Sequence, residues 1–161
     1  SDIKQPILLV VPEGKSEEAI TRLARVGYDY ALGYLEGGME AWIAAGKISD
    51  KLTSISSLEF EQRTKKQTLS VLDVRKKGEY DTMHLMLDGL QNFPLNQINR
   101  FTQLDAQKTY YIHCAGGYRS VIAASILKSN GFLNIIDIAG GFAAIKKTNL
   151  NLTESTCHSN L

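Results

Sequence analysis

The amino-acid sequence predicts an α/β fold, with a parallel sheet flanked by helices. Apolar runs of strand length alternate along the chain with longer helical segments, an order typical of strand–helix–strand units. The run Pro6–Val11 is apolar at every position, as expected for a strand buried on both faces. A second, largely apolar run, Leu69–Arg75, ends in charged residues. The ligand site of such a fold is expected beyond the carboxyl ends of the strands.

The composition indicates a globular protein of one domain, or of one domain and a fragment. The chain has 161 residues, of which 43% are hydrophobic and 22% charged, with a net charge of +1. It has no long charged run of the kind that binds nucleic acid, and no apolar run near the ~20 residues that span a membrane. Cys114 and Cys157 are too few for a disulfide framework, so we expect a reducing, cytoplasmic location.

The first 47 residues predict a strand, a helix, a second strand and a second helix. Ser16 is expected to cap the first helix, and Gly27 to end it. The expected elements are a strand at Pro6–Val11, a helix from Ser16 to about Val26, a strand near Tyr30–Leu32 and a helix that carries Met39 and Trp42.

Residues 54–148 predict a longer alternation of helices and strands. Ser56 and Glu59 have the spacing of a capping box at the start of the first helix. The expected elements are this helix, opening at Ser54–Glu59, a strand at Leu69–Arg75, a short helix reaching His84, an extended piece at Asn92–Leu95, a helix at Asn96–Leu104, a strand at Tyr110–His113, a helix at Ser120–Asn130 and a strand at Asn134–Ile138.

The two regions form an internal repeat. The strand, helix, strand and paired glycines of residues 6–47 recur in the same order after Thr109. In this alignment Pro12 stands where the second copy has Cys114, so the first copy lacks that thiol. The matching residues are Ser16 and Ser120, Leu23 and Leu127, Gly27 and Gly131, and Gly37-Gly38 and Gly140-Gly141.

The strongest candidate site is the loop that follows Tyr110–His113. The strand ends at Cys114, and a glycine-rich loop with Arg119 leads to Ser120 at the expected helix N-cap. Loop and helix N–H groups would then point at the sulfur, and the arginine would help to hold a thiolate or an anion. We interpret Cys114 as a nucleophile, although an inert buried cysteine is the simpler alternative. The intervening loop residues are Ala115, Gly116, Gly117 and Tyr118.

Three motifs together resemble the rhodanese, or sulfurtransferase, family. They are Leu72-Asp73-Val74-Arg75 with Glu79-Tyr80 and His84 after it, Cys114 to Ser120, and Ala139-Gly140-Gly141-Phe142. The resemblance implies a rhodanese-like fold and a Cys114 that cycles between thiolate and persulfide, with Ala115 to Ser120 as its cradle. It places Asp73 and Arg75 near the loop as supporting residues. The implied partners are a small sulfur donor and a thiol or cyanide acceptor.

The resemblance also implies a domain organisation. Residues 1–47 are similar to the C-terminal half of a degenerate rhodanese-like domain, 48–53 are the expected linker, 54–148 a complete domain and 149–161 a polar tail. Tandem domains with this cysteine loop look like the C-terminal part of fusions with a metallo-β-lactamase-fold persulfide dioxygenase, so we expect a missing N-terminal domain. Any metal is expected only there, because three scattered histidines form no ligand cluster and no cofactor is implied here.

Two alternatives to sulfur transfer stay open. One is a cysteine phosphatase or arsenate reductase of similar fold, whose loop has one residue more between cysteine and arginine. The other is a non-catalytic docking module. His84 and His113 are interpreted mainly as packing residues, and the pair Cys157-His158 is expected to belong to the tail rather than to a second site.

Overall fold

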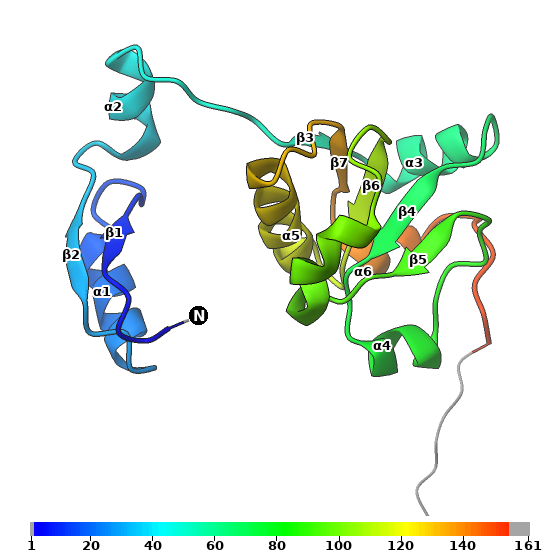
Figure 1. Cartoon of the computed structure of the whole chain (residues 1–161), viewed down its shortest axis with the longest axis horizontal. Helices are drawn as coiled ribbons and strands as arrows, with labels where there is room; N and C mark the ends of the chain where they lie inside the picture. The colour runs from blue at the N-terminus through cyan, green and yellow to red at the C-terminus, as the bar shows by residue number, and fades with distance from the viewer. Residues whose placement is uncertain (1, 155–161) are drawn as a thin grey trace, which may run out of the picture. The chain divides into compact units, whose positions relative to one another are not determined.

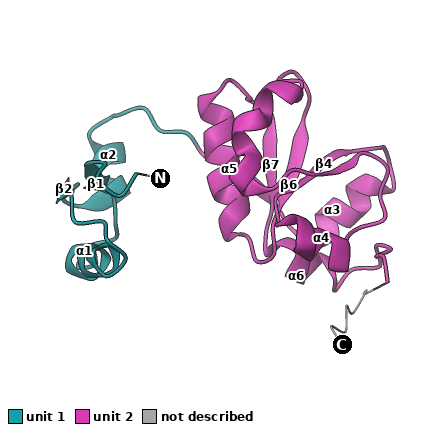
Figure 2. Ribbon diagram, turned by 60° about the horizontal axis from the view of Figure 1, so that its bottom comes forward, with its two compact units in different colours: residues 1–50 teal, residues 51–161 magenta. Residues whose placement is uncertain are grey.

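The computed structural model describes residues 2–154. The chain divides into two compact units, with the boundary between Asp50 and Lys51 (Figure 2). The second unit begins its sheet with β3 (Thr53–Ile55). The sequence had assigned Thr53 to the linker and Ser54 to the start of a helix, and both assignments are wrong. A three-residue strand with two exposed positions carries too little apolar pattern to be recognised.

The second unit contains a five-stranded parallel sheet, which confirms the predicted fold class (Figure 1). Its strand order is β3-β7-β6-β4-β5, so β6 is the central strand. A parallel strand between two others must be covered by helices on both faces. The remaining strands are β4 (Ser70–Asp73), β5 (Leu90–Asn92), β6 (Tyr110–His113) and β7 (Ile135–Ile138).

Two hydrophobic cores lie on the two faces of this sheet. Successive strand residues point to opposite faces, so Leu72 and Ile112 enter one core while Val71 and Tyr111 enter the other. The first core packs against α5 (Tyr118–Ser129) and the 3₁₀ helix η1 (Leu95–Gln103), and the second against α3 (Ser57–Thr64) and α6 (Gly141–Ile145).

Two helix boundaries differ from the predictions, and one predicted cap contact is found. The N-cap of α5 is Gly117, and Ser120 lies inside the first turn, so the predicted Ser120 cap is wrong. The helix α4 (Lys77–Thr82) ends before His84, because Met83 is already extended. At α3 one half of the predicted capping box is confirmed, since the Ser56 hydroxyl accepts the N–H of Glu59 at 3.1 Å, while the Glu59 carboxylate accepts from Arg63.

The start of the predicted polar tail is part of the second unit. Leu152 forms an antiparallel bridge with Leu85, and the Thr153 N–H donates to the His84 carbonyl at 2.9 Å. Residues 149–153 therefore hold the segment that follows α4. Within residues 2–154, no helix is long and apolar enough to cross a membrane.

The first unit pairs β1 (Ile7–Leu9) and β2 (Ala31–Tyr34) in parallel, with α1 (Ser16–Ala24) between them and α2 (Gly38–Ala44) after them. Ser16 is the first residue of α1 and does not cap it, because Lys15 holds the N-cap position and makes no side-chain capping bond there. Among the described residues of this unit only Gly38 is buried.

Strand register corrects the alignment of the repeat. Leu9 pairs with Tyr34 in the first unit, and Ile112 pairs with Asp137 in the second, so Leu9 corresponds to Ile112. Counting on from this position, Val11 corresponds to Cys114 and Pro12 to Ala115. Gly38 and Gly141 agree with this register, since a Cβ on Gly38 would meet the Val11 carbonyl at 2.8 Å and one on Gly141 the Cys114 carbonyl at 2.5 Å. Val11, not Pro12, occupies the position of the thiol.

The packing predicts a large stability difference between two positions of α5. Leu127 is fully buried in the first core, whereas Ile122 lies on the outer side of the helix. Leu127→Ala is expected to lower the free energy of unfolding by about 2–5 kcal/mol, because it removes buried methyl groups and leaves a cavity. Ile122→Ala, the matched control, should cost less than about 1 kcal/mol. Urea unfolding of both variants measures the difference, and equal losses would contradict the assigned burial.

Candidate active site

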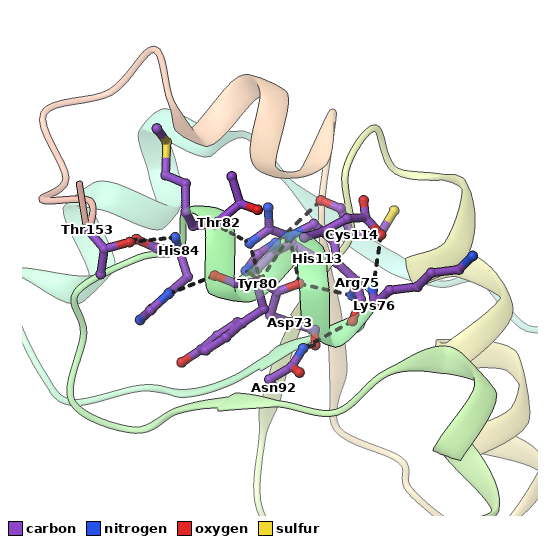
Figure 3. A network of polar contacts seen from close by, with 12 residues as sticks. Asp73, Arg75, Lys76, Tyr80, Thr82, His84, Asn92, His113, Cys114 and Thr153 are labelled. Atoms are coloured by element: carbon purple, nitrogen blue, oxygen red, sulfur yellow. Dashed lines mark hydrogen bonds and ion pairs between the residues drawn. The ribbon is translucent and has the colours of Figure 1, made fainter. Parts of the chain in front are cut away.

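The carboxyl ends of the two neighbouring strands β4 and β6 bring the candidate residues together. Asp73, the last residue of β4, is paired in register with His113, the last residue of β6. Cys114 follows at once, and Arg75 lies two residues beyond Asp73. The predicted loop cysteine and its two supporting residues therefore meet at one edge of the sheet (Figure 3).

The Cys114 sulfur is held by the loop that follows it. The Gly117 N–H donates to Sγ at 3.1 Å, and the thiol lies 3.7 Å from the Ser120 hydroxyl as a hydrogen-bond donor. That hydroxyl in turn donates to the Gly117 carbonyl at 3.0 Å. Cys114 is only 1% exposed, so a reacting sulfur must reach it through the loop.

The loop N–H groups favour the thiolate, and the Ser120 hydroxyl does so when it turns its proton from the Gly117 carbonyl to the sulfur. Burial raises the pKa of Cys114, but the backbone N–H and hydroxyl of Ser120 and the N–H groups of Gly117 and Gly116 lower it by more, so the pKa lies below its ordinary value. Partial positive charges on N–H groups stabilise an anion where bulk water is excluded. Ser120 thus contributes as a hydrogen-bond partner of the sulfur rather than as the predicted helix cap.

The helix α6 fixes the loop from behind. The Phe142 N–H donates to the Cys114 carbonyl at 2.7 Å, and the Ala143 N–H donates to the Ala115 carbonyl at 2.9 Å. Gly141 permits this approach, because a Cβ there would lie 2.5 Å from the Cys114 carbonyl oxygen. The sequence identifies Gly140-Gly141 as a repeated motif, but the repeat alone does not predict that Gly141 lies against the Cys114 carbonyl.

Arg119 does not hydrogen-bond to the sulfur. Its guanidinium donates to both carboxylate oxygens of Glu79, at 2.6 and 2.8 Å, and so joins the start of α5 to α4. This hydrogen bonding raises the pKa of Arg119 and lowers the pKa of Glu79 to about 2. Glu79 is a residue that sequence reasoning missed: its motif was recognised, but its partner lies 40 positions away.

Asp73 and Arg75 form a buried ion pair beneath the loop. The Arg75 Nε donates to Asp73 Oδ1 at 3.0 Å, another of its nitrogens donates to the Met83 carbonyl at 2.9 Å, and the guanidinium lies 3.8 Å from the centre of the Phe142 ring. Asn92 donates to the carbonyls of Asp73 and Arg75. The pair thus connects β4, β5, α6 and the segment after α4.

The two histidines are held by packing and hydrogen-bond contacts. His113 is fully buried, and its Nε2 lies 3.8 Å from Asp73 Oδ2. Burial lowers the pKa of His113 below its ordinary value, so the ring is neutral. His84 stacks on Tyr80 at 3.9 Å, and its Nδ1 lies 2.9 Å from the Tyr80 carbonyl. Cys157 and His158 lie outside the described residues, and within the described part no three His, Cys, Asp or Glu side chains form a metal-binding group.

The loop geometry predicts different effects for its two glycines. Gly117 has a φ of 101° and donates to the sulfur, whereas a Cβ on Gly116 would meet nothing within 4 Å. Gly117→Ala is expected to lower stability by about 1–2 kcal/mol and to raise the pKa of Cys114, because the strained backbone moves the N–H away. Gly116→Ala is the control. Alkylation of Cys114 by iodoacetamide as a function of pH measures the pKa, and an unshifted profile for Gly117→Ala would show that its N–H does not stabilise the thiolate.

The Glu79–Arg119 pair predicts a pH-dependent contribution to stability. Because the pKa of Glu79 in the folded chain, about 2, is below that of the unfolded chain, the pair stabilises the fold above the unfolded value and loses this effect as the pH falls through about 2. The stability difference between the parent chain and Glu79→Gln should therefore shrink from neutral pH to pH about 2.

Urea midpoints across this range measure that difference. The Glu79→Gln, Arg119→Gln double variant is the control, since it should add little to either single change. A difference that stays constant with pH would contradict the pairing.

Known proteins resemble the second unit. The sequence profile of the rhodanese-like domain matches residues 56–148. The chain is 32% identical over 98 residues to the putative sulfur carrier protein YrkF of Bacillus subtilis, and 35% identical over 92 residues to the adenylyltransferase and sulfurtransferase uba4 of Ogataea parapolymorpha. These matches take in 58% and 52% of this chain, and only 52% and 23% of the relatives.

Solved structures agree. A rhodanese-related protein from Thermoplasma volcanium, 27% identical, matches with a TM-score of 0.56 over 63% of this chain and 97% of its own. The thiosulfate sulfurtransferase from Pseudomonas aeruginosa, 21% identical, shares the fold over 96% of this chain and 33% of its own, with a TM-score of 0.53. With the cysteine loop, the buried Asp73–Arg75 pair and the parallel sheet in place, the chain belongs to the rhodanese-like family.

Proposed function

We propose that this chain is a sulfurtransferase that carries sulfane sulfur on Cys114. The donor is thiosulfate or a low-molecular-weight persulfide, and the acceptor is a thiol or cyanide. The observation that carries the proposal is the Gly117 N–H at 3.1 Å from Sγ, in a loop whose N–H groups lower the pKa of Cys114. The names of the sulfur-carrier and sulfurtransferase relatives support the same class of reaction.

The proposed reaction has two halves. The Cys114 thiolate attacks the outer sulfur of the donor, so that an S–S bond to Cys114 forms while the S–S or S–sulfonate bond of the donor breaks. The electron pair leaves on the thiolate or sulfite. The acceptor then attacks the outer sulfur of the persulfide and returns Cys114 as a thiolate. This sequence needs no general base, in keeping with a buried, neutral His113.

The site is less suited to phosphate or arsenate. Four residues separate Cys114 from Arg119, one fewer than in the phosphatase pattern. The Arg119 guanidinium, which an oxyanion would need, already donates both its hydrogen bonds to the Glu79 carboxylate. A carboxylate at this position repels a multiply charged oxyanion. We therefore favour sulfur transfer over the phosphatase hypothesis.

We also propose a cytoplasmic location, where Cys114 would stay reduced.

Replacing the thiol tests the proposed function. Cys114→Ser is expected to abolish sulfur transfer and to keep the fold, because a hydroxyl fits the site but is not ionised there. Cys157→Ser is the matched control and should leave the rate unchanged. Mass spectrometry after exposure to thiosulfate or glutathione persulfide should find one added sulfur on the Cys114 peptide. A folded parent chain without that adduct or any turnover would favour a docking module instead.

A further inference from the structure

The ion pair between Glu79 and Arg119 controls the charge at the entrance to the loop. Two hydrogen bonds of 2.6 and 2.8 Å join the carboxylate to the guanidinium in a bidentate geometry. One of the same carboxylate oxygens also accepts the Lys76 N–H at 3.1 Å, which holds Glu79 at the first turn of α4. The carboxylate is thus fixed from two sides and stays ionised at neutral pH.

The other residues of the cysteine loop are uncharged. Ala115, Gly116, Gly117 and Tyr118 carry no charge, so Arg119 is the single cation between Cys114 and the end of the first turn of α5. Tyr118 is 83% exposed, and Val121 and Ile122, three and four positions further along α5, are 48% and 40% exposed. Residues at this spacing share one helix face, so an apolar surface continues from the loop.

A donor with two negative charges is poorly stabilised beside this ion pair. Thiosulfate is a dianion, and its leaving group, sulfite, carries both charges away. The guanidinium that could stabilise those charges is already bound to a carboxylate. A persulfide needs less charge stabilisation from the protein, since its reacting sulfur carries at most one charge. An apolar organic group on that persulfide can also contact the face formed by Tyr118, Val121 and Ile122.

We propose that Glu79 is a specificity-determining residue that, by neutralising Arg119, makes the Cys114 site select organic persulfides over thiosulfate. This inference rests on the proposed sulfur transfer. In the favoured step the Cys114 thiolate attacks the outer sulfur of R–S–S–H. The new bond joins Sγ to that sulfur, the donor S–S bond breaks, and RS⁻ leaves with the electron pair and takes up the terminal proton. The sulfur is transferred without net oxidation. Glu79 touches neither sulfur and acts through Arg119.

Glu79→Gln in the full chain tests the proposal. The amide keeps the shape of the side chain and can still accept a hydrogen bond from Arg119, but the negative charge is gone. The ratio of kcat/KM for thiosulfate to kcat/KM for the persulfide of 2-mercaptoethanol, whose organic group is uncharged, is expected to rise about tenfold, the effect of regaining one charge-assisted contact. Asp81→Asn is the matched control, because Asp81 lies on the same helix and pairs with Lys77. It should leave the ratio unchanged. An unchanged ratio in Glu79→Gln, or an equal fall for both donors, would overturn the inference.

Alkylation of Cys114 separates this inference from the proposed function. Iodoacetate is an anion and iodoacetamide is neutral, and both react with the same thiolate, so their rate ratio reports charge at the entrance and cancels changes in the thiolate fraction. The ratio at the Cys114 peptide should rise several-fold in Glu79→Gln. If it rises while the parent chain transfers sulfur from neither donor, the charge effect stands and the proposed function fails. If it does not rise, the inference fails whatever the turnover.

Discussion

The hydrogen bonds from α6 to the carbonyls of Cys114 and Ala115 are the constraint on which the site depends. With these carbonyls bound at 2.7 and 2.9 Å, the loop turns its N–H groups toward the sulfur. The approach is possible only without a side chain at Gly141, where a Cβ would lie 2.5 Å from a carbonyl oxygen. In the proposed reaction these donors would keep their positions as the sulfur changes between thiolate and persulfide, because they belong to a backbone fixed by another helix.

Charge at the site is balanced in pairs, and the thiolate is stabilised chiefly by dipoles. Asp73 neutralises Arg75 under the loop, and Glu79 neutralises Arg119 beside it. An unpaired buried charge would be costly, so the buried Arg75 needs its carboxylate. The Cys114 sulfur is stabilised by the loop N–H groups and the Ser120 hydroxyl. These dipoles stabilise one negative charge without adding a full positive charge. This arrangement suits a weakly charged sulfur group better than a multiply charged oxyanion.

The parts of this protein that the sequence predicts are those with a local signal. Runs such as Tyr110–His113 are apolar on both faces and lie at the centre of the sheet, and Cys114 stands out because a glycine-rich turn follows it. The helix start was misplaced, since a glycine at positive φ can begin a helix as well as a serine can cap it. The Glu79–Arg119 pair could not be predicted, because nothing in either segment specifies a partner 40 residues away. The role of Gly141 was hidden for the same reason.

The first unit shows that the loop support and the chemistry are separable. Gly14, at a φ of 72°, matches Gly117, and Gly38 approaches the Val11 carbonyl as Gly141 approaches that of Cys114. Lys15, the residue after Gly14, pairs with Glu18 of α1 at 2.9 Å. Leu8 and Leu32 are 77% and 68% exposed, whereas their counterparts in the second unit are covered by neighbouring strands and helices. In the second unit β4, the turn after it and α4 supply Asp73, Arg75 and Glu79. A thiol at Val11 would therefore lack both the buried ion pair and the carboxylate partner, so the proposed chemistry would need the whole five-stranded sheet and not the cysteine loop alone.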